Sequence, residues 1–506
     1  MKHLILNDCD NVVVLSEQAN SGSIIFIGGA ALAKSVPRGH KIARHFIGNG
    51  KAIYKFGHII GFASQDIAVG EHVHSHNCAF GNHPESAQHG RHLATAQAAI
   101  PKVTSRTFDG YGRADGQVGT RNMIALIATV NCSATVIRKA ADVIASSGLL
   151  DKYPNVDGIV ALAHSSGCGM DSSGVGAQVL ERVLWGYATH PNIGAAVFVG
   201  LGCEVMQVAR MKQKFEAVGH QRFYGLTIQD TGGTTSTIEH IVARVKEILP
   251  VVDEARRTPH PLSALSIALQ CGGSDGYSGI TANPALGVAS DLIVGHGGRV
   301  ILAETPEIYG AEQLLLDRVS SPETATDLIA QLRWWEGYTS MHGGTLDNNP
   351  SPGNKAGGLT TILEKSLGAV AKSGATPLNQ VVAYGQKPTR SGLIFMDTPG
   401  YDPVSVTGQI AGGAQIVVFT TGRGSAFGSK PAPTIKLATN DQLFAKMRDD
   451  MDISCGDIAS SGVSLAHKGE QILDYIIETA SGRATKSETL GFGDHEFVPW
   501  QLGAVM

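Results

Sequence analysis

From about residue 106 onward, the sequence repeats one pattern, in which an apolar run is followed by a segment with helical periodicity. The first run covers residues 124–130 and precedes an amphipathic stretch at 133–148. Further apolar runs begin at residues 158, 195 and 223. Because this alternation is typical of parallel strands buried beneath helices, it predicts an α/β domain over residues 106–250.

The flanking regions differ from this pattern. Residues 1–80 contain short apolar segments between Gly, Ser and Asn turns, and these predict a small all-β domain with strands at NVVVL, SIIFIG, AIYKFG and HIIGFA. Residues 81–105 lose the alternation and are expected to be a linker. A second connection at 250–263 carries charge and three prolines, after which strand-like runs resume. We therefore expect a third domain, also α/β, over residues 264–506, and a multidomain α/β fold class overall.

Length and charge exclude several functional classes. The 506 residues are enough for several hydrophobic cores. The chain has 40 Lys and Arg against 44 Asp and Glu, a net charge of −4, and no basic stripe, so we expect no nucleic-acid partner. No apolar run approaches the ~20 residues that span a bilayer, and acidic residues lie where a signal peptide would be apolar. These features predict a cytoplasmic protein with small-molecule partners and no membrane contact.

Four of the seven cysteines lie just past apolar runs, namely Cys132, Cys168, Cys203 and Cys271. An odd number of scattered cysteines argues against disulfides and predicts reduced thiols. Since ligands of α/β sheets bind beyond the carboxyl ends of strands, the loops there can bring distant thiols together. Two interpretations stay open: ordinary buried cysteines, or a site for a soft metal, an iron–sulfur cluster or a reactive thiol.

Histidines form a second group of candidate functional residues. His72, His74 and His76 alternate along the chain, so on a strand they share one face and could hold a divalent metal. The alternative is a solvated, histidine-rich strand end. His164, four residues before Cys168, is a candidate acid or base, or else a core histidine with its hydrogen bonds satisfied.

Polar residues also cluster after the later strand-like runs, where glycines allow close approach of a ligand. One such cluster contains Glu304 and Glu307. Arg and Lys side chains there suit carboxylate recognition, or are plain surface charges. The candidate substrate-binding residues are Arg121, Ser274, Asp275, Asn354, Lys355, Thr421, Arg423 and Lys430.

Long stretches of the chain resemble the altronate/galactarate dehydratase family, a group of bacterial sugar-acid dehydratases. The matching segments include Gly70 to Asn77, Val118 to Asn122, Gly200 to Glu204, Cys271 to Gly276, Asn349 to Gly358 and Phe419 to Gly424. The resemblance implies an N-terminal β-clip domain of the SAF type at 1–80, a Rossmann-like middle domain and a C-terminal α/β domain. It also implies a requirement for Fe²⁺ or another divalent metal.

The resemblance leaves the substrate open. The histidines at 72, 74 and 76 resemble the altronate branch of the family, whereas residues 152–158 and 390–394 look more like the galactarate branch. Sulfolactate sulfo-lyase is similar to the same family, but it divides the corresponding domains between two chains.

We therefore expect a metal-dependent dehydratase of the type that converts altronate to 2-keto-3-deoxygluconate, removing the C2 proton and expelling water from C3. His164 is the candidate base, and His72 and His74 are metal ligands or the acid pair. The metal is either mononuclear iron or an iron–sulfur cluster on three of the four strand-end cysteines. A thiol-nucleophile enzyme pairing Cys168 with His164, or a non-catalytic sugar-acid binding protein, are the alternatives of another class. A homodimer is the default assembly.

Overall fold

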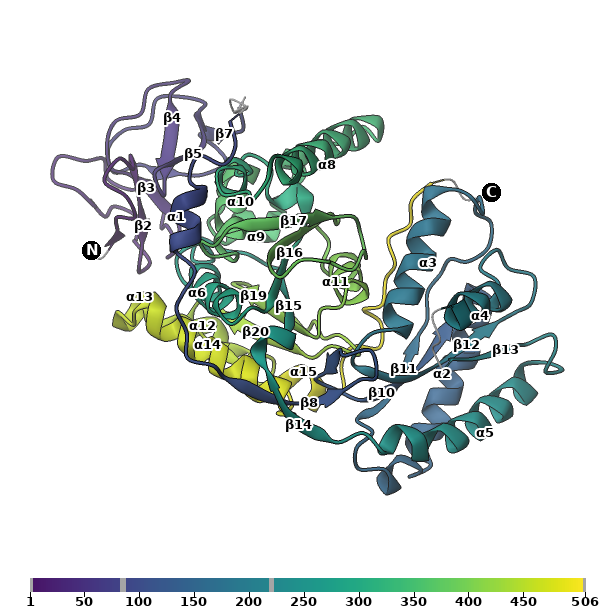
Figure 1. Ribbon diagram of the computed structural model, residues 1–506. Coiled ribbons are helices and arrows are strands. Elements are labelled where there is room, and N and C mark those ends of the chain that lie inside the picture. Colours follow the sequence, from purple (N-terminus) through teal and green to yellow (C-terminus); the bar gives the residue numbers. More distant parts are fainter. Residues whose placement is uncertain (1–2, 82–87, 218–222, 504–506) are drawn as a thin grey trace.

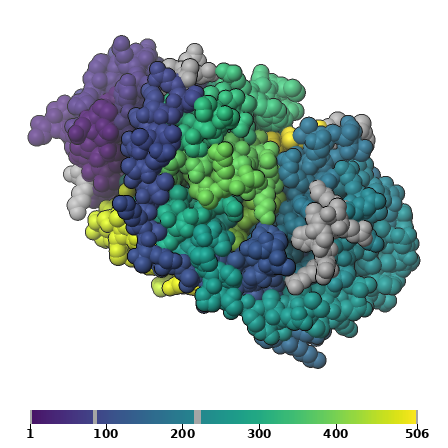
Figure 2. All heavy atoms as spheres, viewed as in Figure 1, coloured from purple at the N-terminus to yellow at the C-terminus, as the bar shows by residue number. Residues whose placement is uncertain are grey.

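The computed structural model describes residues 3–81, 88–217 and 223–503 and contains three domains. The N-terminal domain and the middle domain lie at opposite ends of the molecule, with the C-terminal domain between them (Figure 1). The space-filling view shows the chain after the N-terminal domain crossing the surface of the C-terminal domain toward the middle domain (Figure 2). None of the helices in the described ranges combines the length and apolar character needed to cross a membrane.

Two small antiparallel sheets form the N-terminal domain. One contains β1 (His3–Leu4), β2 (Val12–Leu15), β3 (Lys41–Ala43) and β6 (His72–Val73), and the other contains β4 (Ala52–Lys55), β5 (His58–Ala63) and β7 (Cys78–Ala79). The strand predicted at 23–28 was wrong, because Ile24 forms only an isolated bridge to Ala31. Ile24 and Ile27 are exposed and Gly28 turns the chain at φ +76°, so only Ile25 and Phe26 of this segment pack against the core, and both are only partly buried.

Part of the expected linker is helical. Within 88–105, helix α1 (Leu93–Ala98) packs beside the C-terminal domain, and residues 82–87 of the predicted linker lie outside the described part of the chain. The second expected connection, 250–263, is more ordered than a linker. It contains the end of α5 (Thr234–Asp253), strand β14 (Arg257–Pro261) and a 3-10 turn (Leu262–Ala264). Strand β14 pairs with β8 (Thr107–Gly112), which forms a hairpin with β9 (Val118–Gly119).

The middle domain contains a four-stranded parallel sheet in the order β11-β10-β12-β13. Its elements are β10 (Met123–Ala128), α2 (Asn131–Ser146), a 3-10 turn (Leu150–Lys152), β11 (Gly158–Leu162), α3 (Val175–Ala188), β12 (Ile193–Gly200), α4 (Val208–Ala217), β13 (Phe223–Thr227) and α5 (Thr234–Asp253). Ile127 packs with α3 and α4 on one face, and Leu126 packs with α2 and α5 on the other. Both faces are therefore buried, as parallel strands require, which confirms the α/β prediction.

The C-terminal domain is built on seven parallel strands in the order β17-β18-β16-β15-β19-β20-β21. These strands are β15 (Ser266–Cys271), β16 (Arg299–Leu302), β17 (Leu378–Val382), β18 (Gly392–Met396), β19 (Ile416–Thr421), β20 (Thr434–Ala438) and β21 (Ile453–Ser454). β15 lies in the centre, and the chain continues to β16 on one side and returns as β19 on the other. Such a reversal of strand order leaves a crevice at the carboxyl edge.

Helices and short turns cover both faces of this sheet (Figure 1). They are α6 (Ala282–Gly295), α7 (Gln313–Leu316), α8 (Pro322–Met341), α9 (Pro352–Ala356), α10 (Ile362–Ala371), α11 (Asp402–Ala411), α12 (Asp441–Lys446), α13 (Asp457–Ser461), α14 (Leu465–Ala480) and α15 (Lys486–Thr489), with 3-10 turns at Thr305–Glu307 and Leu346–Asn348. Side chains of α3 and α11 share one hydrophobic core, which joins the middle domain to the C-terminal domain.

Candidate active site

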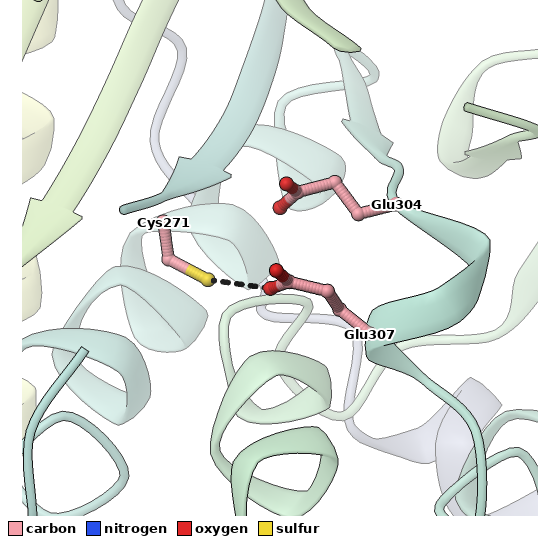
Figure 3. A group of neighbouring side chains, drawn as sticks. All are labelled: Cys271, Glu304 and Glu307. Atoms are coloured by element: carbon pink, nitrogen blue, oxygen red, sulfur yellow. Dashed lines mark hydrogen bonds between the residues drawn. The ribbon is translucent and has the colours of Figure 1, made fainter. Parts of the chain in front are cut away.

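Three potential metal ligands meet at the carboxyl edge of the C-terminal sheet. Cys271 ends β15, while Glu304 and Glu307 follow the adjacent strand β16. Their side chains point into one space, and the Cys271 thiol lies 3.5 Å from Oε2 of Glu307 (Figure 3). Among the described residues, this is the only group of three His, Cys, Asp or Glu side chains whose donor atoms all lie within 4.8 Å of one another.

Two buried lysines from the end and middle of α10 reach the same space. Lys365 and Lys372 are seven residues apart, so two helical turns place them on one face. Nζ of Lys365 donates to Glu307 Oε1 at 2.5 Å and to Asn349 Oδ1 at 2.8 Å. Nζ of Lys372 donates to the sulfur of Cys271 at 2.9 Å and lies 3.7 Å from Glu304.

Glu304 is the least satisfied member of this centre. Neither carboxylate oxygen has a hydrogen-bond partner, although both are buried. Its backbone adopts a left-handed conformation at φ +71°, which costs a non-glycine residue of order 1–3 kcal/mol. Burial and the nearby charge of Glu307 raise the pKa of Glu304 well above its usual range. Burial also acts on Glu307, but Lys365 and Lys372 outweigh it and lower the pKa of that carboxyl.

A cavity of about 410 Å³ opens onto this centre. Its wall includes Cys271, Glu307, Lys365, Asn349, Asn354 and Asp402. Asp402 begins α11, and its Oδ1 accepts a hydrogen bond from the Gln270 amide at 2.8 Å. Burial, with a contribution from the charge of Glu307, raises the pKa of Asp402 to about 6. A side chain at Gly272 would place its Cβ 2.4 Å from Asp402 Oδ2, so glycine keeps this carboxylate in position.

The candidate histidines form a separate cluster where the N-terminal domain meets the C-terminal domain. Antiparallel pairing of β3 with β6 brings His40, just before β3, against His72. The rings of His40, His72 and His74 lie 5.1–5.3 Å apart, and His76 lies 5.6 Å from His72. His40 was not predicted as a site residue, because only the strand pairing reveals its neighbours.

Hydrogen bonds define the protonation of this cluster. The carbonyl oxygens of Ala356 and Lys355 accept from Nε2 of His40 and of His74, at 3.3 and 2.8 Å. Nδ1 of His40 is then the acceptor for Nε2 of His72, 3.1 Å away. Burial, followed by the neighbouring imidazoles and Lys41, lowers the pKa of His40 to about 4 and that of His72 to about 3, so both are neutral near pH 7.

The short segment 351–358 lies between the histidine cluster and the cavity. Asn354 lines the cavity and donates to the Ser274 carbonyl at 2.9 Å, while the Lys355 carbonyl accepts from His74. Asp275 is buried, its carboxylate bonded to Ser278, Thr439 and Asn440. The structure therefore brings the predicted residues Ser274, Asp275, Asn354 and Lys355 next to the histidines.

Four further candidates lie elsewhere or have other partners. All five N–H groups of the Arg121 guanidinium are taken by Glu488 and by the carbonyls of Thr120, Thr479 and Arg483. Lys430 pairs with Asp494 at 2.7 Å. Thr421 accepts from the Gly424 amide, and Arg423 is exposed, its backbone N–H donating to the Gly273 carbonyl.

His164 follows β11 in the middle domain, whereas His72 and His74 belong to the N-terminal domain, and these two domains lie at opposite ends of the molecule (Figure 1). Its Nε2 donates to the Ala128 carbonyl at 2.9 Å, and its Nδ1 accepts from the Ser166 amide at 3.2 Å. Burial lowers the pKa of His164 to about 4. Both ring nitrogens are thus occupied by backbone groups.

The four strand-end cysteines divide between two sheets. Cys271 is buried in the C-terminal domain, where burial raises the pKa of its thiol to about 12 despite Lys372. Cys132, Cys168 and Cys203 are exposed on the middle domain.

Three residues at the cavity wall or directly behind it were not predicted. Asp402, Lys365 and Lys372 carry no motif, and the two lysines occur within the apolar helix ILEKSLGAVAK. The available signal was their seven-residue spacing, which places both lysines on one face of an otherwise apolar helix. Because lysines are almost never buried without a partner, that face would be expected to meet acidic groups. Glu304 and Glu307 stood out as a polar cluster but received no role.

Three domain families match the chain in succession. Residues 1–80 match the altronate/galactarate dehydratase SAF domain, and residues 110–253 match the second domain of D-galactarate dehydratase/altronate hydrolase. Residues 262–505 match the C-terminal domain of D-galactarate/altronate dehydratase.

Curated relatives match nearly the whole chain. Altronate dehydratase of Bacillus subtilis is 35% identical over 486 residues, 96% of either chain. Altronate dehydratase of Escherichia coli is 34% identical over 97% of this chain and 98% of its own length. Galactarate dehydratase (L-threo-forming) of Escherichia coli is 36% identical over 95% of this chain and 93% of its own length.

Proposed function

Because this chain belongs to the D-galactarate/altronate dehydratase family, we propose that it removes water from a sugar acid in the cavity beside Cys271. The observation that carries this proposal is that Lys365 lies at the cavity wall together with the buried carboxylates of Glu307 and Asp402. Removing a proton next to a carboxylate requires a base at that wall and positive charge to stabilise the anion that forms. The cavity has both.

Asp402 is the proposed base for the C2 proton. Its pKa of about 6 leaves it ionised at neutral pH yet basic enough to accept a proton. Lys365 is the proposed partner of the substrate carboxylate. Its ammonium has three donors, of which Glu307 and Asn349 use two.

The residues at this site fit a divalent metal. Two buried carboxylate oxygens without partners, on Glu304, are the ligands such an ion prefers, and Cys271 and Glu307 complete the set. A thiolate among carboxylates suits Fe²⁺ or a similar ion better than Mg²⁺ or Ca²⁺. When bound, the metal would stabilise the negative charge that develops on the substrate carboxylate.

An aldonate of the altronate type is the proposed substrate, and galactarate is the second candidate. The histidines at 72, 74 and 76 support the first, while the galactarate dehydratase relative supports the second. A panel of altronate, galactarate, other aldonates and sulfolactate, assayed anaerobically with Fe²⁺ for 2-keto-3-deoxy product or sulfite, tests the choice. We expect that one acid of the panel yields product, that a chelator abolishes product formation and that Fe²⁺ restores it. A turnover rate that the chelator leaves unchanged would contradict the metal site.

Several finer points remain proposals. We infer a Rossmann-like middle domain from its parallel sheet. We also infer that the protein is cytoplasmic, that it forms a homodimer and that it binds small sugar acids. The roles assigned to His164, and to His72 and His74 as ligands or acid pair, stay predictions that single alanine variants can test in the same assay.

A further inference from the structure

Three exposed thiols occupy one edge of the middle domain, away from the proposed dehydratase centre. Cys132 is the second residue of α2, after β10, and Cys168 and Cys203 lie in the loops after β11 and β12. These three strands are neighbours in the order β11-β10-β12 and run parallel, so their carboxyl ends share one edge. The three loops therefore begin side by side.

Backbone hydrogen bonds hold these loops together beside each cysteine. The Asn131 amide, next to Cys132, donates to the Ser166 carbonyl at 2.9 Å. The Val205 amide, two residues after Cys203, donates to the carbonyl of Gly167 at 3.0 Å. Gly167 directly precedes Cys168. Each thiol is thus within two residues of a bond that joins its loop to the next.

Glycines allow the loops to approach this closely. Gly167 has φ +104°, and a Cβ there would lie 2.2 Å from the Thr129 carbonyl oxygen. Gly202, before Cys203, has φ +128°, and a Cβ there would lie 2.3 Å from Gln229. A Cβ at Gly167 would meet backbone atoms and push the loops after β10 and β11 apart, whereas a Cβ at Gly202 would meet only the flexible side chain of Gln229.

The exposure of the thiols points to ligands and not to core packing. Cysteine is among the most buried residue types, and Cys78, Cys271 and Cys455 of this chain follow that rule. The three sulfurs do not all lie within 4.8 Å of one another, whereas thiolates on one tetrahedral zinc lie about 3.8 Å apart. A cluster in which each sulfur binds a different iron accommodates a wider spacing.

We propose that Cys132, Cys168 and Cys203 bind an iron–sulfur cluster at this edge of the middle domain. Each cysteine would bind one iron as a thiolate, and its proton would pass to solvent. Cys271 takes no part, because it belongs to the C-terminal sheet and to the carboxylate centre. The site is thus independent of the dehydratase centre in the cavity.

The test is anaerobic reconstitution of the full chain with ferric iron, sulfide and dithiothreitol, followed by iron and acid-labile sulfide analysis and visible absorbance. We expect about four irons per chain and a broad visible band. Single Cys132→Ser, Cys168→Ser and Cys203→Ser variants should each lose most of the band and the bound sulfide. The matched control is Cys9→Ser, which removes an exposed thiol in the N-terminal domain and should keep both.

Circular dichroism and thermal unfolding of the apo variants separate cluster loss from misfolding. A triple Cys→Ser variant that folds and still binds iron and sulfide would overturn the proposal. So would stoichiometric zinc binding by the purified protein without acid-labile sulfide. Because the readouts are spectroscopic and analytical, failure here leaves the dehydratase proposal standing, and failure of the dehydratase assay leaves this one standing.

Discussion

Glu364 and Lys365 are neighbours on α10 but belong to two buried ionic clusters, which differ in how completely their polar atoms are hydrogen-bonded. Glu364 faces the N-terminal domain, where both of its oxygens accept from Lys41, one from Lys55 and one from Thr360. Lys365 faces the cavity and its group of acids. In the first cluster both oxygens of Glu364 and both lysine nitrogens are hydrogen-bonded, whereas in the second neither oxygen of Glu304 has a hydrogen-bond partner and Lys372 lies 3.7 Å away.

This difference supports a structural role for the first cluster and agrees with the catalytic role proposed for the second. A buried charge is tolerated when hydrogen bonds replace its water, so the Lys41–Lys55–Glu364 cluster can fasten one domain to another. A buried carboxylate without partners costs free energy, and such groups concentrate where a ligand will complete them. The strained backbone of Glu304 agrees with this view.

The largest expected effect is on catalysis at the cavity. Asp402→Asn keeps the shape of the side chain but removes the proposed base, so kcat should fall ~10²–10⁴-fold. The free energy of unfolding should change little, since the Gln270 amide can still donate to the remaining carbonyl oxygen. Steady-state kinetics and urea unfolding measure the two quantities. Unchanged kcat would exclude Asp402 as the base.

The next effect concerns stability at the docking cluster. Glu364→Gln leaves Lys41 and Lys55 buried without their counter-charge and should lower the free energy of unfolding by about 3–5 kcal/mol. If denaturant titration shows a decrease in the free energy of unfolding of less than about 1 kcal/mol, the cluster does not stabilise the contact between the two domains.

The two clusters should also respond to pH differently. Asp402 must be ionised, so kcat/KM should fall about tenfold per unit as pH drops below about 6. Lysines around Glu364 lower its pKa despite burial, so its contribution to stability is present above the unfolded carboxyl pKa of about 4.3 and is lost as pH falls further. An activity profile flat between pH 7 and 5 would contradict the role of Asp402.

The histidine cluster also makes stability depend on pH, so the pH dependence of stability does not report on Glu364 alone. His40 and His72 have pKa values of about 4 and about 3 in the fold, below the unfolded value of about 6.5. The unfolded chain therefore binds protons that the native state does not, and stability should decline as pH falls from about 6.5. His72→Gln should reduce this slope in unfolding titrations between pH 6.5 and 5, and an unchanged slope would show that His72 is not buried as a neutral ring.

The smallest effect is expected at a predicted binding residue with an exposed partner. Lys430→Ala breaks a pair with the exposed Asp494 and should cost less than about 1 kcal/mol, with KM unchanged. A large rise in KM would restore Lys430 as a substrate ligand.

The fold could be predicted further than the site. Apolar runs such as 124–130 identified the parallel strands, because both faces of such strands are buried. The run at 23–28 misled, since Ile24 and Ile27 remain exposed and apolar composition alone does not supply a partner strand. Cys271 was a candidate ligand from its place after a strand, and the structure adds the two glutamates that surround it.

Local sequence patterns were enough to predict the domain order, the two parallel α/β domains, the strand-end positions of the cysteines and the histidine run. These are properties of short stretches, where periodicity and turn residues act locally. Only the folded structure shows that His40 is hydrogen-bonded to His72, that all N–H groups of the Arg121 guanidinium have partners, and that Glu364 and Lys365 contact different clusters. Hydrogen-bond partners and burial depend on residues that lie far apart in the chain, such as Lys41 and Glu364, 323 positions apart, or Arg121 and Glu488, 367 positions apart, and no local pattern specifies such contacts.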